Sequence, residues 1–352
     1  MGEEYEQVLL VDVISIFDEL IGHLGQHGVV SGDETYIQPY VYLSLHVVEM
    51  RAAGWHVDFD RIAAVSGASA LFGHQPGEFM AKYAHTRLDL DERIAQATGF
   101  GYEWVEFADV DEAWQVVVDS IINAGTALKG WDWENILFGG YEDAATPEDR
   151  RVFAMADGPG TYALWLTWDE FGEWVTRMGE WKCQRFGRYR GRVEAKPSPE
   201  VARRVMRDLV AWSVEPPENI IQNWPEATWG LAGIEALAAE VKTSSLDEDW
   251  VACHGLNPQW TIRNSTAIYL KDIAEEEVFS EAVNMHLIAA AEQYRSAFEC
   301  WQAFEALLGH NTSETARKTK ARRSAGAAIV YAWLEHEKAA LAEVEQALAA
   351  LA

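Results

Sequence analysis

The residues best placed to do chemistry lie in one short segment, Trp131-Asp132-Trp133-Glu134-Asn135, between two runs that are typical of strands. Asp132 and Glu134 lie on one face if the strand continues through them. Aromatic neighbours desolvate a carboxyl group and raise its pKa, so this pair could exchange protons with a substrate or hold a cation. We predict Asp132 and Glu134 as catalytic residues and Trp131 as part of a ligand-binding wall. The alternative is a turn with solvated acids and core tryptophans.

Two other pairs contain a nucleophile next to an imidazole. Ser44 and His46 are two positions apart in a predicted helix, so their side chains point to different faces. Cys253 and His254 are adjacent and precede a predicted helix, and a cysteine in such a place is commonly a small buried hydrophobic residue. We expect neither pair to act as a nucleophile and its base.

Metal and cofactor motifs are missing from the sequence. His23 and His27 have the i, i+4 spacing of two ligands on one helix face, but the three glycines around them indicate a helix end. The chain has no H-E-x-x-H zinc motif, no G-x-x-x-x-G-K-[ST] phosphate loop and no dinucleotide glycine fingerprint. We therefore expect no metal and no cofactor.

The charge of the chain restricts its partners. The 352 residues include 28 Lys and Arg against 56 Asp and Glu, a formal net charge of −28. Nucleic acids and anionic membrane surfaces attract positive charge, so we expect neither as a partner. The one concentrated basic run, residues 317–323, is expected to be a solvated helix face that pairs with the protein's own acids. With 49% hydrophobic residues and 16 Trp, the chain is not a disordered acidic segment.

The cysteines and the N-terminal segment bear on the compartment. Cys183, Cys253 and Cys300 are odd in number and far apart, so a disulfide framework is not expected. Acids interrupt the apolar stretch near Met1, which does not fit a signal peptide, and no apolar run is long enough to span a bilayer. We expect a cytoplasmic protein.

The first half of the chain places helices before strands, which predicts an α+β fold rather than alternating βαβ units. Residues 5–24 fit a short helix or a strand equally well. Residues 185–200, rich in basic residues, Gly and Pro, are expected to be a connector. The predicted helices are 38–53, 58–65 and 109–124, with another from residue 169, and the predicted strands are 126–131, 135–141, 151–155 and 162–167.

The second half has helical periodicity almost throughout. A short break between the last two predicted helices makes them an antiparallel hairpin, through which two copies could form a homodimer. Tryptophans recur here, and an aromatic pocket between the domains, with Arg263 as the anchor for an anionic ligand, is one interpretation. Core packing is the other. The predicted helices are 199–213, 228–243, 264–308 and 312–351.

Several phrases of the sequence resemble a known family. VDFDRIAAVSGASALFG (57–73), AWQVVVDSIINAGTALKGWDWENILFGGYED (113–143), YALWLTWDEF (162–171) and GLAGIEALAAEV (230–241) are similar to papain-like proteins of the double-glycine peptidase type. They resemble more closely the butirosin-biosynthesis-H-like family. The resemblance implies a papain-like α+β domain over residues 1–195 and a helical domain over 196–352.

The residues that papain-like chemistry requires do not occur at the expected positions. The resemblance places the nucleophile near Tyr40, but residues 36–46 contain no cysteine, and the histidine position falls at or near Glu134. Without a thiol and an imidazole, the usual covalent route is lost. Tyr40 and Ser44, on the nucleophile helix, are then expected to contact a ligand.

Two functions follow from this departure. One is a small-molecule-binding or -processing protein of the butirosin-biosynthesis-H-like family, with acyl or amide transfer or hydrolysis that uses no cysteine nucleophile. The other is a catalytically lapsed papain-like protein that serves as a ligand-binding or scaffold subunit. Both take a small molecule as partner, and the sequence leaves them open.

Overall fold

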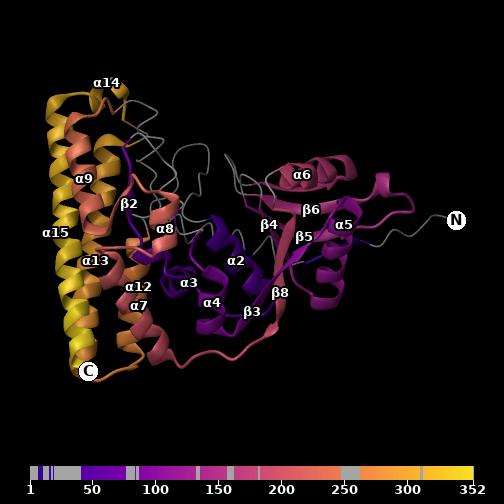
Figure 1. Ribbon diagram of the computed structural model, residues 1–352, viewed down its shortest axis with the longest axis horizontal. Coiled ribbons are helices and arrows are strands. Elements are labelled where there is room, and N and C mark those ends of the chain that lie inside the picture. Colours follow the sequence, from indigo (N-terminus) through magenta and orange to yellow (C-terminus); the bar gives the residue numbers. More distant parts are fainter. Residues whose placement is uncertain are drawn as a thin grey trace.

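The computed structural model describes residues 7–10, 16, 19, 41–76, 84, 87–131, 135–156, 162–180, 183–246, 262–309 and 312–351. The protein is α+β. Figure 1 shows an antiparallel sheet with helices α5 (Val110–Asp119) and α6 (Trp168–Glu180) at one end of the molecule and a stack of long helices at the other. Helices α2 (Val41–Ala52), α3 (Phe59–Ser66) and α4 (Leu90–Thr98) lie between them.

The sheet has seven strands in the order β3-β8-β4-β5-β6-β7, and β1 pairs with β5. All pairings are antiparallel, which fits the hairpin-like spacing of the predicted strands. The strands are β1 (Gln7–Leu9), β3 (Phe100–Glu106), β4 (Leu128–Trp131), β5 (Asn135–Glu142), β6 (Arg151–Ala156), β7 (Tyr162–Thr167) and β8 (Arg185–Arg192).

The expectation of a connector over residues 185–200 is wrong for its first half. Strand β8 lies inside the sheet between β3 and β4. Its basic residues are accommodated on the sheet because Arg188 pairs with Glu103 at 2.9 Å and Arg185 lies over the Trp104 ring at 4.7 Å. Composition alone therefore misleads here, since the arginines find cross-strand partners that the local sequence does not contain.

The two faces of the sheet carry different cores. Leu128 and Phe138 lie in the cluster formed with α5 and α6, whereas Leu137 lies in the cluster that contains α2. Because side chains alternate along a strand, Lys129 lies on the α2 face, opposite Leu137 in the register of β4 and β5. The helices are α2 (Val41–Ala52), α3 (Phe59–Ser66), α4 (Leu90–Thr98), α5 (Val110–Asp119) and α6 (Trp168–Glu180), and a π-helical turn (Ser120–Ala124) extends α5.

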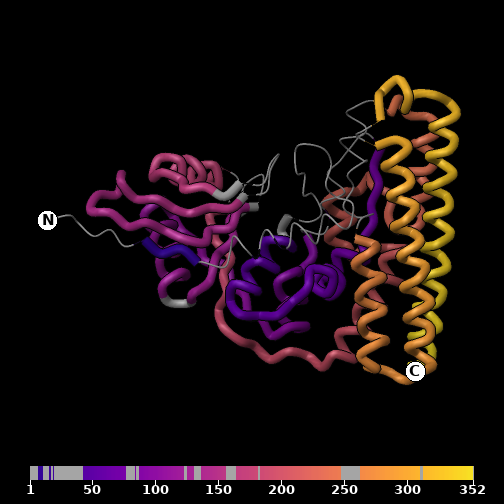
Figure 2. The backbone as a smooth tube through the Cα atoms, turned by 180° about the vertical axis from the view of Figure 1, so that it is seen from behind, coloured from indigo at the N-terminus to yellow at the C-terminus, as the bar shows by residue number. Residues whose placement is uncertain are grey.

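The helical half ends in the expected hairpin, which Figure 2 shows with the C-terminus at one end. The single helix predicted over 264–308 is two, because the chain turns at residues 276–280, where Glu277 adopts a positive φ of 55°. In the described part of the chain, no helix is both long and apolar enough to cross a membrane. The helices are α7 (Ser198–Trp212), α8 (Glu218–Asn223), α9 (Gly230–Thr243), α12 (Arg263–Glu275), α13 (Glu281–Leu308), α14 (Glu314–Arg317) and α15 (Lys320–Ala350).

Packing crosses the predicted domain boundary at residue 195. One hydrophobic cluster contains side chains of α2 and α3 together with those of α7, α12, α13 and α15. A two-stranded sheet also joins the halves, β2 (Gly73–His74) pairing with β9 (Thr228–Trp229). The described parts of the two halves thus share a core.

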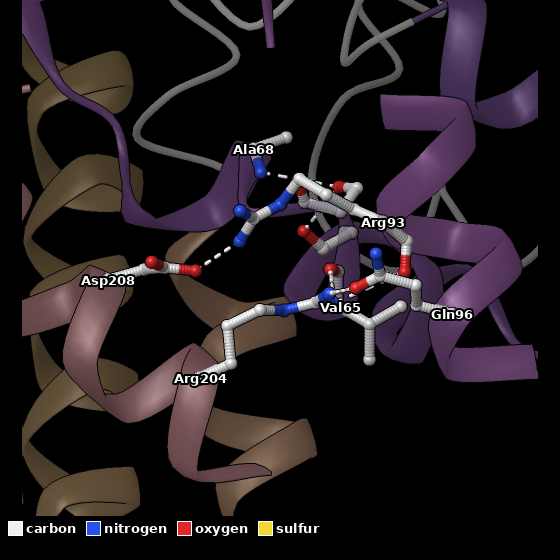
Figure 3. A network of polar contacts seen from close by, with 8 residues as sticks. Val65, Ala68, Arg93, Gln96, Arg204 and Asp208 are labelled. Atoms are coloured by element: carbon white, nitrogen blue, oxygen red, sulfur yellow. Dashed lines mark hydrogen bonds and ion pairs between the residues drawn. The ribbon is translucent and has the colours of Figure 1, made fainter. Parts of the chain in front are cut away.

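A polar network adds to this contact (Figure 3). The Arg93 guanidinium, on α4, binds Asp208 on α7 and donates from Nε to the Ser66 carbonyl at 2.7 Å. Arg204, one turn away on α7, donates to the Val65 carbonyl at 2.7 Å and to Gln96 at 2.9 Å. Two arginines therefore satisfy the carbonyl groups at the end of α3, where helical hydrogen bonds run out.

Candidate functional site

Three titratable side chains meet where α2 faces the sheet. His46 and Glu49 are three residues apart on α2 and therefore share a face, with His46 Nδ1 and Glu49 Oε2 3.8 Å apart. Lys129 of β4 completes the group, because its Nζ donates a hydrogen bond to His46 Nδ1 and lies 4.0 Å from Glu49 Oε2. We call His46, Glu49 and Lys129 the buried triad.

Aromatic rings enclose the buried triad. Lys129 Nζ lies 4.4 Å from the centroid of the Tyr102 ring, a cation–π distance. The His46 ring meets Tyr102 and Phe100 edge-on, at centroid distances of 5.0 and 5.5 Å. The side chains of the triad are at most 1% exposed. An amine, an imidazole and a carboxyl group are thus held together out of water.

Burial controls the protonation of all three groups. It lowers the pKa of Lys129 from 10.5 to about 8, although Asp91 and Glu49 act in the opposite direction. Burial and the neighbouring Lys129 hold the pKa of His46 well below 6.5, so the imidazole is neutral and its Nδ1 accepts. Burial raises the pKa of Glu49 well above 4.5, against the attraction of Lys129 and a backbone hydrogen bond from Tyr189.

These protonation states suit proton transfer. A lysine with a pKa near 8 is partly neutral at physiological pH, and a neutral amine is a general base or a nucleophile. The neutral His46 holds the Lys129 amine in place through their hydrogen bond. Glu49 can balance the positive charge of Lys129 when the amine is protonated. Asp91, on α4, is held by a hydrogen bond from Trp104 Nε1 at 2.9 Å and attracts the Lys129 cation. The triad can therefore accept a proton and pass it on.

The structure places only some of the predicted site residues. Tyr40, Asp132 and Glu134 lie outside the described residues, as do Cys253 with His254 and His23 with His27. Ser44 is buried on α2, two residues before His46, at 2% exposure. Trp131 ends β4, two residues after Lys129. The predicted carboxylates thus follow directly on the strand that carries Lys129.

Arg263 is not part of this group and is already paired. Its Nε lies 2.6 Å from Glu337 Oε1, and its Nη1 donates to the Ser69 carbonyl. The guanidinium therefore meets a carboxylate of the protein where the sequence interpretation placed an anionic ligand. The nearby Trp212 and Trp229 are buried in the shared core, which agrees with core packing.

The basic run at residues 317–323 is not a solvated face throughout. Arg317 is buried, and its guanidinium donates to the carbonyl groups of Leu246, Gly309 and Thr312. Arg322 donates to the Leu307 carbonyl at 2.7 Å. Much of the run therefore binds carbonyls near the hairpin turn rather than acids.

The sequence did contain a signal for the triad. His46 and Glu49 are polar residues at i, i+3 inside the largely apolar stretch of α2, and Lys129 interrupts an apolar strand. Such residues on a buried face need polar partners, but nothing in the sequence says that they partner one another. Among the described residues, no group of three His, Cys, Asp or Glu side chains is arranged to hold a metal ion.

Comparison of the sequence with protein-family models and with curated proteins found no match.

Proposed function

We propose that this protein binds and processes a small molecule in its α+β half, with Lys129 as the proton acceptor and His46 and Glu49 as its partners. The observation that carries the proposal is the meeting of an amine, an imidazole and a carboxyl group on the α2 face of the sheet, where Lys129 is hydrogen-bonded to His46 and the Glu49 carboxyl group lies within 4.0 Å of both. Removing three such groups from water costs several kcal/mol, which a fold needing only stability could avoid with apolar residues.

The reaction class follows from the chemistry of the triad and from the resemblance of the sequence. A buried neutral amine can take a proton from a hydroxyl, an amine or water as that group attacks a carbonyl carbon, and the resulting ammonium can return the proton to the leaving amine or alcohol as its bond to that carbon breaks. This supports acyl or amide transfer, or hydrolysis, in a papain-like domain of the butirosin-biosynthesis-H-like type that uses no cysteine.

We also propose a cytoplasmic location and, through α13 and α15, a homodimer.

Competitive acetylation tests the role of Lys129. Folded protein is treated with limiting acetic anhydride from pH 6 to 11, and each lysine is quantified by mass spectrometry. We expect Lys129 to react and its rate to rise through about pH 8. Lys196, which is 44% exposed and pairs with Glu200, is the reference. If Lys129 stays unmodified while Lys196 reacts, the triad is a sealed structural network and the catalytically lapsed alternative holds.

Native mass spectrometry of the purified protein then tests for the small molecule. We expect a bound compound that Lys129→Met releases and Lys196→Met retains. Glu134→Gln tests the carboxylates predicted from the sequence in the same assay. Loss of the compound in Glu134→Gln but not in Lys129→Met would move the site from the triad to the segment that follows β4.

A further inference from the structure

A small cavity lies where the helical half meets the short helix η1 (Ala68–Ala70) of the α+β half. Its volume is about 10 Å³, about the minimum that one water molecule needs. Arg263, Tyr294 and Glu337 contribute buried polar groups to its lining. These residues belong to α12, α13 and α15, so the cavity lies where three helices of the bundle meet the rest of the protein.

The charged groups at this cavity are paired with each other. Arg263 Nε lies 2.6 Å from Glu337 Oε1, which also accepts a hydrogen bond from Trp333 Nε1 at 2.8 Å. Arg263 Nη1 reaches across to the Ser69 carbonyl, just before the end of η1. This ion pair therefore links the hairpin helix α15 to the α+β half through one guanidinium.

Tyr294 is the group whose bonding is incomplete. Its side chain is fully buried, and in the described structure its hydroxyl has no hydrogen-bond partner. Burial and the nearby Glu337 raise the pKa of Tyr294, so the phenol keeps its proton and can both donate and accept. A buried hydroxyl without a partner costs free energy, and native proteins usually satisfy it with a protein group or an ordered water.

We propose that this cavity binds one ordered water molecule, held by Tyr294 Oη and by the Arg263–Glu337 pair. Empty cavities in proteins are apolar, whereas a cavity lined by a guanidinium, a carboxylate and a hydroxyl offers the two to four polar partners that an internal water uses. The water gives Tyr294 its missing hydrogen bond and completes the polar contact between the bundle and η1.

A crystal structure at a resolution that shows other internal waters tests the site directly. We expect one density peak within hydrogen-bonding distance of Tyr294 Oη and of Arg263 or Glu337. An empty cavity, or a peak that does not reach Tyr294, would overturn the proposal.

Water-oxygen relaxation dispersion gives a second measurement in solution. Tyr294→Phe should lower the number of long-lived internal waters by one relative to the wild type. Tyr269→Phe, a change of another buried tyrosine that does not line the cavity, should leave that number unchanged. Equal numbers in the wild type and in Tyr294→Phe would contradict the assignment.

Discussion

Lys129 and His46 are hydrogen-bonded side chain to side chain although 83 positions separate them in the chain. The bond joins β4 to α2 in a group whose side chains are at most 1% exposed. It couples the protonation of the two residues, because a proton on His46 Nδ1 would remove the acceptor that the Lys129 amine uses.

Removing the amine should destabilise the protein through the carboxyl group left behind. Lys129→Met keeps most of the side-chain volume but leaves Glu49 buried without its cationic neighbour. We expect the free energy of unfolding at pH 7, measured with urea, to fall by about 1–3 kcal/mol.

The Lys129→Met, Glu49→Gln double variant completes a thermodynamic cycle with the two single variants. Since Glu49→Gln removes the carboxyl group that Lys129→Met leaves without its partner, the double variant should lose less stability than the sum of the single losses, by at least about 0.5 kcal/mol. Strictly additive losses would mean that the two groups do not interact in the folded protein.

The lowered pKa of Lys129 should make the free energy of unfolding depend on pH. Its pKa is about 8 in the folded protein against 10.5 for the free group, so between these values the unfolded chain binds more protons. Stability contributed by this residue therefore rises with pH across that window, by about 3 kcal/mol. Urea unfolding from pH 7 to 10.5 should show the rise in the wild type and in Lys196→Met, but not in Lys129→Met.

His46 should make the stability of the protein depend on pH in the acid range. Its folded pKa lies well below 6.5, so below pH 6.5 the unfolded chain takes up a proton that the folded protein does not. The contribution of His46 to stability is complete above pH 6.5 and is lost as the pH falls. Thermal unfolding from pH 7 to 5 should show a weaker decline in His46→Phe than in the wild type, and an identical decline would argue against a neutral buried imidazole.

The polar network at α7 should require an arginine at position 93. Arg93 binds Asp208, donates to the Ser66 carbonyl, and lies over the Trp212 ring at 5.2 Å. A lysine cannot make the two hydrogen bonds and the stacking contact together. Arg93→Lys should therefore cost about 1–3 kcal/mol of unfolding free energy.

Arg61→Lys is the matched control for that change. Arg61 pairs with Glu276 at 2.8 Å, but the side chains are 39% and 45% exposed. Exposed ion pairs contribute little, so the loss should stay below about 1 kcal/mol. Equal losses in the two variants would show that the partly buried network contributes no more than a surface pair.

Gly230 should tolerate no side chain. It has a φ of 58°, and a Cβ there would overlap the backbone carbonyl oxygen of Ser213. Gly125 has a similar φ of 63°, but a Cβ at that position would meet no atom within 4 Å. Gly125→Ala should therefore cost only the left-handed backbone strain, about 1–2 kcal/mol, and Gly230→Ala clearly more, as measured by urea unfolding. Similar losses would mean that the backbone at Ser213 can move away.

Local elements with a strong pattern were predictable. The helix expected over 109–124 exists because its apolar residues repeat at helical spacing and Asp109 caps it by accepting from the Glu112 amide. The strands β4 to β7 were predicted close to their observed bounds. Strand β8 was missed, since the partners of its arginines, Glu103 and aromatic rings, belong to other elements. Helix α4 and strand β3 were not predicted at all.

The sequence by itself determined the α+β class, the run of helices in the second half and the acidic charge, because periodicity and composition are local properties. It also placed polar residues in apolar surroundings at His46, Glu49 and Lys129. Only the tertiary structure decided that these three meet, because alternation along β4 turns Lys129 towards α2, and the register of the sheet sets which turn of the helix it reaches. Their chemistry depends on that packing, since it is the loss of water around them that moves their pKa values.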